Sequence, residues 1–390
     1  PSPAVIYFLF ALMICGSIGI ILGLFYRISA VVFFLAFTYV ELLDKTYYLN
    51  HYYFVSLIAL ILIFLPANKG YSLDVKWRKK SRLKMVPNWT VAIIMFQITV
   101  VYVFAGIAKI NSDWLLQAQP LKIWLHSAGE WPLVGSLLTQ DWVAYFFSWF
   151  SCFYDLFIIL LLINRKTRFI GFILVFAFHF LTWLMFPIGV FPWVMIVGSL
   201  IFLAPELHQK LLRSVFGDKN SNHTQIPSTT SPGLGILPKI VLIGFICFQL
   251  LFPFRFLLNK GDLFWTESGY RFSWRVMLME KAGYSTFYIQ ENEKSFEVDN
   301  RNFLTKAQEK QMATQPDMIL QYANYLSEVY ADTTMIINGL PFEFTSPEVN
   351  AEIYVSLNGR KSQEYVNSSV ALTQIPNNFA DRNWLSPFNK

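Results

Sequence analysis

The sequence predicts an α-helical, polytopic membrane domain of about eight transmembrane helices, followed by a small, mainly β extracytoplasmic domain with a helix. Hydrophobic residues make up 55% of it, aromatic residues 18% and charged residues only 14%. Soluble domains usually contain roughly 25% charged residues. Residues 1–251 consist mostly of apolar runs, whereas charges and short alternating segments follow Gly261. We therefore expect a membrane domain at 1–256 and an α+β or β-sandwich-like domain at 257–390.

Eight apolar segments are candidates for the helices, because a helix needs about 20 predominantly apolar residues to cross a bilayer. Four segments have about that length: Ala4–Tyr26, Thr90–Ala108, Val143–Ile163 and Phe169–Phe186. Four others are shorter or are bounded by proline: Ile28–Leu43, His51–Leu65, Ile188–Leu203 and Leu237–Leu251. If all eight cross, alternate loops lie on opposite sides of the membrane.

The loop charges orient these spans, since cytoplasmic loops carry an excess of Lys and Arg. One set of alternate loops is strongly basic: Arg27, Lys69, Lys76, Arg78, Lys79, Lys80, Arg82, Lys84, Arg165, Lys166, Arg168, Lys210, Arg213 and Lys219. The other set has only Lys45, Lys109 and Lys122 before the soluble domain. We expect the basic set, with a polar linker at 217–235, in the cytoplasm and the C-terminal domain outside. The net charge of +6 is explained by these basic loops, so we expect membrane lipid and no nucleic acid as a partner.

Local patterns predict the elements of the C-terminal domain. Ser285–Gln290 and Ser295–Asn300 flank a polar turn, as the strands of a β-hairpin do. Another strand is expected at residues 353–357, where apolar residues alternate before the turn pair Asn358-Gly359. Between them, four apolar positions repeat at helical spacing: Ile319, Tyr322, Ala323 and Leu326.

The sequence offers no pattern typical of a metal or nucleotide site. Its five histidines lack ligand spacing, and no cysteine stands near them. Gly19 and Gly23 lie in an apolar run at the small-residue spacing by which membrane helices pack. All three cysteines fall in apolar runs, so we expect no structural disulfide.

Hydrogen-bonding or charged side chains lie at the outer ends of predicted spans: Asp44, Asn50, His51 and Lys109. Ionisable groups at membrane depth are costly and often mark a functional site. An interfacial Lys or His also serves as a snorkelling anchor, so both interpretations stay open. Asp155 and His179 lie deeper, where interhelical hydrogen bonding is favoured over catalysis.

The segment from Gly261 to Glu280 interleaves aromatic rings with arginines: Trp265, Tyr270, Arg271, Trp274 and Arg275. Such residues at a membrane exit are typical of an interfacial aromatic belt. They are equally suited to a pocket for a peptide carboxylate, because Arg binds carboxylates bidentately. The pattern alone does not separate the two.

Seven blocks, in order along the chain, resemble the vitamin K-dependent gamma-glutamyl carboxylase family, a family of HTTM-domain proteins. Three of them read GLFYRIS at residues 23–29, LDKT through NH at 43–51, and AGIAKINSDW at 105–114. The other four are Phe178-His179, Ile188–Phe191, Trp265–Trp274 and Gln321–Ala323. The chain thus resembles a bacterial member of this family. The family's additional first membrane helix is missing, so we expect an upstream piece to be absent, and propeptide-guided binding is not carried over.

The resemblance implies a peptidyl-glutamate carboxylase, a lyase. A reduced naphthoquinol, from vitamin K or a menaquinone, is deprotonated and reacts with oxygen to give the quinone epoxide. The strong base produced on the way removes a γ proton from a Glu-containing protein or peptide, and the carbanion adds carbon dioxide. The resemblance implies that Lys109 is the base for the quinol. It implies that Asn50 and His51 hold the quinol oxygens. Residues 265–275 correspond to the Glu-binding region, and Asp44 and His179 are supporting residues.

Two other functions stay open. A quinol epoxidase or related quinone oxidoreductase without Glu carboxylation would keep Asn50, His51 and Lys109 but would need no Glu pocket. A non-catalytic membrane receptor or transporter for a quinone or peptide would bind its ligand without turnover, and replacing Lys109 would then only weaken binding.

Overall fold

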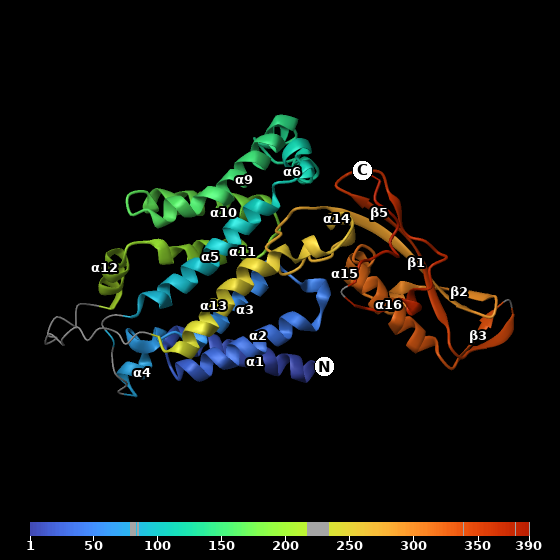
Figure 1. The fold of residues 1–390 in the computed structure, drawn as a ribbon, viewed down its shortest axis with the longest axis horizontal. Helices are drawn as coiled ribbons and strands as arrows, with labels where there is room; N and C mark the ends of the chain where they lie inside the picture. The colour runs from blue at the N-terminus through green and yellow to red at the C-terminus, as the bar shows by residue number, and fades with distance from the viewer. Residues whose placement is uncertain (79–82, 84–85, 217–233, 338, 379, 390) are drawn as a thin grey trace. The chain divides into compact units, whose positions relative to one another are not determined.

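The computed structural model describes residues 1–78, 83, 86–216, 234–337, 339–378 and 380–389 (Figure 1). Two compact units make up the chain. The helical unit comprises residues 1–44, 48–107 and 150–251, and the mixed unit comprises residues 45–47, 108–149 and 252–390. The domain boundary after residue 256 stays a prediction. Some of the predicted cytoplasmic residues lie outside the described ones: Lys79, Lys80, Arg82, Lys84 and the linker at 217–233.

All eight predicted spans are helical. In the helical unit, wholly or for most of their length, lie α1 (Pro3–Leu22), α2 (Tyr26–Leu43), α3 (Asn50–Phe64), α4 (Leu73–Lys76), α5 (Asn88–Ala108), α9 (Asp141–Ile163), α10 (Arg168–Met185), α11 (Phe191–Ser199), α12 (Pro205–Phe216) and α13 (Ile236–Leu251). Among the described residues, six helices are long and apolar enough to cross a membrane: α1, α2, α5, α9, α10 and the stretch Ile236–Leu258. The predicted membrane fold is therefore confirmed.

The two remaining predicted spans take other forms. The α3 helix is apolar but has only 15 residues. The segment Phe191–Phe202, which contains α11 and the 3-10 turn η3 (Leu200–Phe202), is bent by 108° from α12. Pro205, which begins α12, lacks a backbone N–H and so interrupts the helical hydrogen bonds. Counted as one broken span, this pair raises the total to seven.

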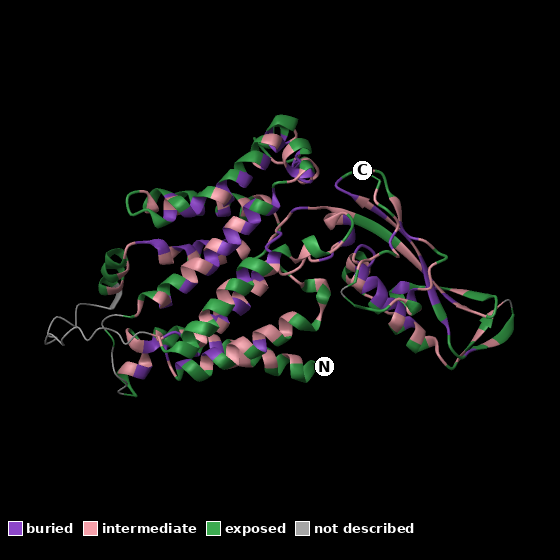
Figure 2. Ribbon diagram, in the orientation of Figure 1, coloured by how far each residue is buried: buried purple, intermediate pink, exposed green. Residues whose placement is uncertain are grey.

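Close contact between α1 and α2 depends on glycines of α1 (Figure 1). A Cβ atom at Gly16 would lie 3.0 Å from Cβ of Phe33, and one at Gly19 would clash with the Ser29 hydroxyl. Gly23 instead caps α1 in the left-handed conformation, with φ +59°. Gly16 and Gly19 are therefore the glycines of α1 that pack closely on α2, whereas Gly23 makes its close approach to Ser72, where an added Cβ would clash with the Ser72 Cβ. Elsewhere α1 exposes apolar side chains (Figure 2), as a lipid-facing helix does.

An antiparallel sheet dominates the mixed unit, with strand order β2-β1-β5-β6. Its strands are β1 (Lys281–Glu291), β2 (Lys294–Val298), β5 (Glu348–Leu357) and β6 (Gln363–Val366). A second sheet pairs β3 (Thr333–Ile337) with β4 (Leu340–Phe344). The same unit contains η1 (Lys45–Tyr47), α6 (Ser112–Gln117), α7 (Leu121–His126), α8 (Gly135–Leu138), η4 (Phe252–Leu258), α14 (Leu263–Thr266), η5 (Asn300–Asn302), α15 (Lys306–Met312), α16 (Pro316–Tyr330) and η6 (Leu372–Gln374).

The predicted hairpin and helix of this unit are confirmed. Strands β1 and β2 pair around Asn292 and Glu293, which both have positive φ, as a tight hairpin turn requires. The four apolar positions predicted for the helix lie in α16 and are buried. They pack with inward side chains of β1 and β5, so one hydrophobic core joins helix and sheet (Figure 1).

Candidate active site

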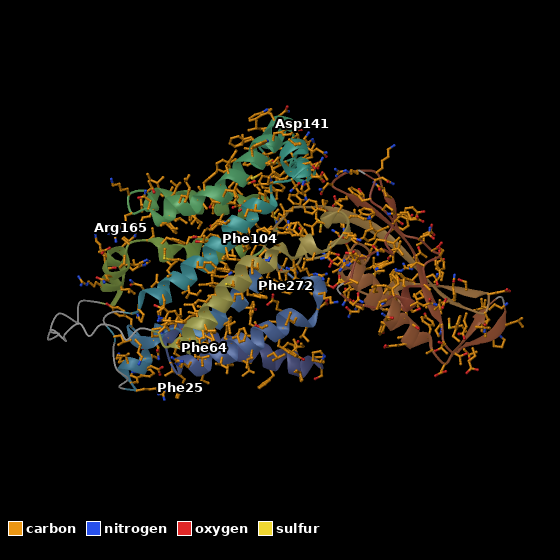
Figure 3. The ribbon with its side chains drawn as sticks, viewed as in Figure 1. Phe25, Phe64, Phe104, Asp141, Arg165 and Phe272 are labelled. Atoms are coloured by element: carbon orange, nitrogen blue, oxygen red, sulfur yellow. The ribbon has the colours of Figure 1, made fainter. Side chains whose placement is uncertain are left out.

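Lys109 directly follows α5, whose buried Phe104 is labelled in Figure 3. Its side chain is buried, with 7% of the residue exposed. The amine lies 5.6 Å from the ring centroid of Trp114, within cation–π range. Trp114 is fixed in turn, because its Nε1 donates a 2.9 Å hydrogen bond to the Ser148 carbonyl. Lys109 therefore lies over a buried and anchored indole ring.

Asp113, beside this indole, binds the turn between β5 and β6. Its two carboxylate oxygens accept hydrogen bonds of 2.7 and 2.8 Å from the Arg360 guanidinium. Asn358 donates a third bond of 2.7 Å through Nδ2. Hydrogen bonding to Asp113 raises the pKa of Arg360. A bidentate Arg–carboxylate pair of this kind fixes orientation as well as charge.

Arg271, predicted to bind substrate Glu, contacts an internal carboxylate. Its Nη1 donates a 2.6 Å hydrogen bond to Asp317 Oδ2, and its Nη2 bonds Gln315 Oε1. Lys45 Nζ lies 3.2 Å from the same Asp317 oxygen. Burial raises the pKa of the Asp317 carboxyl, but the opposing effect of Arg271 and Lys45 is larger and lowers it to about 2. Asp317 is therefore ionised and shared by two cations at neutral pH.

The other residues of the aromatic and arginine segment are of two kinds: some belong to the hydrophobic core, and others have a strained backbone. Trp265 belongs to the hydrophobic core, and its Nε1 donates a 2.8 Å bond to the Ser386 carbonyl. Arg275 is buried over the Phe256 ring, 4.4 Å from its centroid, and burial lowers the pKa of Arg275 to about 10. Phe272, labelled in Figure 3, and the buried Trp274 have φ of 55° and 60°. Burial also raises the pKa of Tyr270.

Non-glycine residues with positive φ are uncommon and cluster at functional sites. Phe272, Trp274 and also Met277 fall in this class within six residues of chain. The segment therefore holds a strained backbone next to two arginines. Trp265, by contrast, is part of the domain core.

In the helical unit, both predicted histidines join an aromatic cluster. The His51 ring lies 5.7 Å from the Phe191 ring, which lies 6.0 Å from the His179 ring. Nε2 of His179 is 2.8 Å from the hydroxyl of Tyr102. Four helices, α3, α11, α10 and α5, thus bring two imidazoles and two aromatic rings together.

Asp44 and Asn50 lie at the two ends of the loop that connects α2 to α3. Asn50 opens this helix, and its Oδ1 accepts a 3.2 Å hydrogen bond from the Tyr48 hydroxyl. Asp44 caps the C-terminus of α2. Asn50, His51, His179 and Asp44 belong to the helical unit, whereas Lys109 and the 265–275 segment belong to the mixed unit.

Two known protein families match this chain, one in each part of the sequence. The model of the HTTM domain matches residues 1–207, which is more than half of the chain. The model of the vitamin K-dependent gamma-carboxylase lumenal domain matches residues 236–390. The chain is a gamma-carboxylase-like member of the HTTM family. No solved structure matches it.

Membership of the HTTM family confirms the resemblance found in the sequence. With six candidate spans among the residues that the structure describes, this HTTM protein is a multi-pass membrane protein. The lumenal character of the matched C-terminal family indicates that this domain lies outside the cytoplasm. The carboxylase family of the lumenal domain supports a carboxylase-like function.

Several residues around the predicted positions carry no signal in the sequence: Tyr102, Asp113, Phe191, Asp317 and Arg360. Asp113 and Phe191 are partial exceptions, because they belong to the AGIAKINSDW and Ile188–Phe191 blocks. The others lie in apolar runs or in ordinary polar segments. Nothing in their spacing marks them.

Proposed function

We propose that this HTTM-family protein couples oxygen-dependent epoxidation of a reduced naphthoquinone to the carboxylation of peptidyl Glu to γ-carboxyglutamate. The observation that carries the proposal is the match to both the HTTM domain and the gamma-carboxylase lumenal domain in one chain. The quinol is reduced vitamin K or a menaquinol, and oxygen and carbon dioxide are co-substrates. A Glu-containing protein or peptide is the partner.

Lys109 is the proposed base for the quinol, on the strength of its place in the AGIAKINSDW block. Its local surroundings support this role. The amine is buried and lies over Trp114, and exclusion of water protects reactive intermediates from hydrolysis and stray proton transfer. An amine can accept a proton only in its neutral form, which a guanidinium does not offer in proteins.

Asn50 and His51 are the proposed partners of the quinol oxygens. When bound, the quinol supplies the electrons that reduce oxygen. The residues present fit such a ligand, because His51 and His179 lie around the apolar ring of Phe191 and an imidazole can form hydrogen bonds with a hydroxyl oxygen. Imidazole can donate to a hydroxyl oxygen or accept from it, depending on its tautomer.

The segment at residues 265–275 is the proposed Glu-binding region, with Arg271 and Arg275 as its cations. Arg271, however, is already bound to Asp317. A peptide carboxylate would have to compete with that internal carboxylate. This contact favours the second candidate function, a quinol epoxidase that carries out no Glu carboxylation.

Both functions are tested by one incubation of the membrane-embedded protein with reduced quinone, oxygen, labelled bicarbonate and a Glu peptide. Mass spectrometry detects label in the peptide, and chromatography detects the epoxide. We expect both products. Formation of the epoxide alone would indicate a quinol epoxidase. If neither product forms but the quinone still binds, the protein would be a non-catalytic receptor.

A further inference from the structure

The contact between Asp113 and Arg360 joins two segments that are 247 residues apart in the chain. Asp113 is 8% exposed, and three donors converge on its carboxylate at 2.7 to 2.8 Å. A buried carboxylate with a bidentate guanidinium and a further amide donor is held in one orientation.

The turn that presents these donors is itself fixed. Asn358 adopts the left-handed conformation with φ 51°. Its backbone N–H donates to the Glu280 carbonyl at 2.8 Å, and its Oδ1 accepts the Glu280 N–H at 2.8 Å. The Arg360 carbonyl accepts a 2.6 Å bond from the Ser356 hydroxyl. The β5–β6 turn is therefore a rigid support for the carboxylate of Asp113.

On its other side, Asp113 lies in the first turn of α6, next to Trp114. The N-cap Asn111 connects this helix to Lys109. Its Oδ1 accepts the Trp114 N–H at 2.9 Å, and its N–H donates to the Lys109 carbonyl at 2.9 Å. A shift of α6 would thus move both the indole under the amine and the backbone that carries the amine.

We propose that Asp113, Arg360 and Asn358 form a clamp by which the C-terminal domain positions Lys109 for catalysis. The clamp residues are positioning residues, which act on Lys109 through α6 and Trp114. This inference rests on the proposed function of Lys109 as a base. It makes the C-terminal domain part of the quinol chemistry, in addition to its proposed role in binding the Glu peptide.

The test uses Arg360→Lys in the full chain in membranes, because lysine keeps the charge but loses the bidentate fork. Arg301→Lys is the matched control, since Arg301 pairs with Asp299 on the exposed surface of the same unit. The first measurement is the rate at which a small acylating reagent modifies Lys109, followed by mass spectrometry. We expect faster modification in Arg360→Lys than in the wild type or the control, because Trp114 no longer covers the amine.

The second measurement is quinol epoxidation. Misplacement of a reacting group by about 1 Å can cost roughly 100-fold in rate. We expect kcat to fall by about 10- to 100-fold in Arg360→Lys with little change in KM for the quinol. In a Lys109→Ala background with an added small amine, Arg360→Lys should cause no further loss, because no tethered amine remains to be positioned.

The clamp proposal would be overturned if Arg360→Lys left the rate of Lys109 modification unchanged. It would also be overturned if Arg360→Lys reduced epoxidation equally in the amine-rescued Lys109→Ala background. Faster modification in a protein without any epoxidase activity would support the clamp and reject the proposed function instead. If Arg360→Lys fails to fold, Asn358→Gly takes its place, because glycine keeps the left-handed backbone while removing one donor to Asp113. The same outcomes then apply.

Discussion

The hydroxyl of Tyr102 lies 2.8 Å from Nε2 of His179, and both side chains are buried between α5 and α10. Hydrogen bonds between membrane helices are worth about 0.6 kcal/mol on average and at most about 1.7. We therefore expect Tyr102→Phe to destabilise the protein by an amount in this range. Thermal unfolding in detergent measures it, with Tyr7→Phe as the control, since Tyr7 is exposed. Equal unfolding temperatures for the two variants would show that the contact contributes nothing.

Gly19→Ala should loosen the packing of α1 on α2. The added methyl group would meet the Ser29 hydroxyl, whereas a Cβ at Gly244 in α13 meets nothing within 4 Å. Alanine is otherwise favoured over glycine in a helix by about 0.8 to 1.0 kcal/mol. We expect Gly19→Ala to lower the unfolding temperature and Gly244→Ala to leave it unchanged or raise it. The opposite order would contradict the close approach of the two helices.

The ion pairs of Asp317 should make the stability of the protein depend on pH in acid. The pKa of Asp317 in the folded protein is about 2, below the usual value of about 3.9. A depressed pKa means that the stabilisation is present above about pH 4 and is lost as the pH falls through 2. The stability difference between wild type and Asp317→Asn should therefore be largest near neutral pH and shrink in acid. Asp299→Asn, in the exposed pair with Arg301, is the control and should show a much smaller difference.

Arg271 can bind the substrate Glu or hold Asp317, and two alanine variants separate these roles. Losing a charge-assisted hydrogen bond to a carboxylate costs about 1.5 to 3 kcal/mol. If Arg271 binds the peptide, Arg271→Ala should reduce Glu carboxylation by about 10- to 100-fold while epoxidation is kept. Asp317→Ala should then preserve carboxylation or improve it. Parallel losses of both activities in both variants would mean that the pair is structural.

Local features of the mixed unit were predictable from the sequence. The β1–β2 turn needs only two adjacent residues that accept positive φ, here Asn292 and Glu293. The buried face of α16 follows from helical spacing alone. The bend after Phe202 was not recognised, because hydropathy registers an apolar run and not the lost hydrogen bond at Pro205.

Contacts between distant residues could not be predicted. No periodicity specifies that Asp113 pairs with Arg360, or that Arg271 pairs with Asp317. The sequence does not separate Trp265 from a peptide pocket, because an aromatic residue beside arginines has the same pattern in a core and at a surface. Tyr102 carries no signal in the sequence, because aromatic residues are 18% of the chain and fill its apolar runs, and Phe191 stands out only as part of the Ile188–Phe191 block. Lys109, Asn50 and His51 stand out in the sequence as polar residues at the outer ends of predicted spans, and the family resemblance supplies their expected roles.

The central claim is that Lys109 acts as the base in quinol epoxidation, and replacing it with arginine tests this most directly. Arginine keeps a cation at this position but stays protonated, so it cannot accept a proton. We predict that Lys109→Arg and Lys109→Ala both lose nearly all epoxidation and carboxylation. Added small amines should partly restore Lys109→Ala, increasingly as their neutral form accumulates at higher pH. Near-normal turnover in Lys109→Arg would show that the residue is a fixed positive charge and would contradict the account.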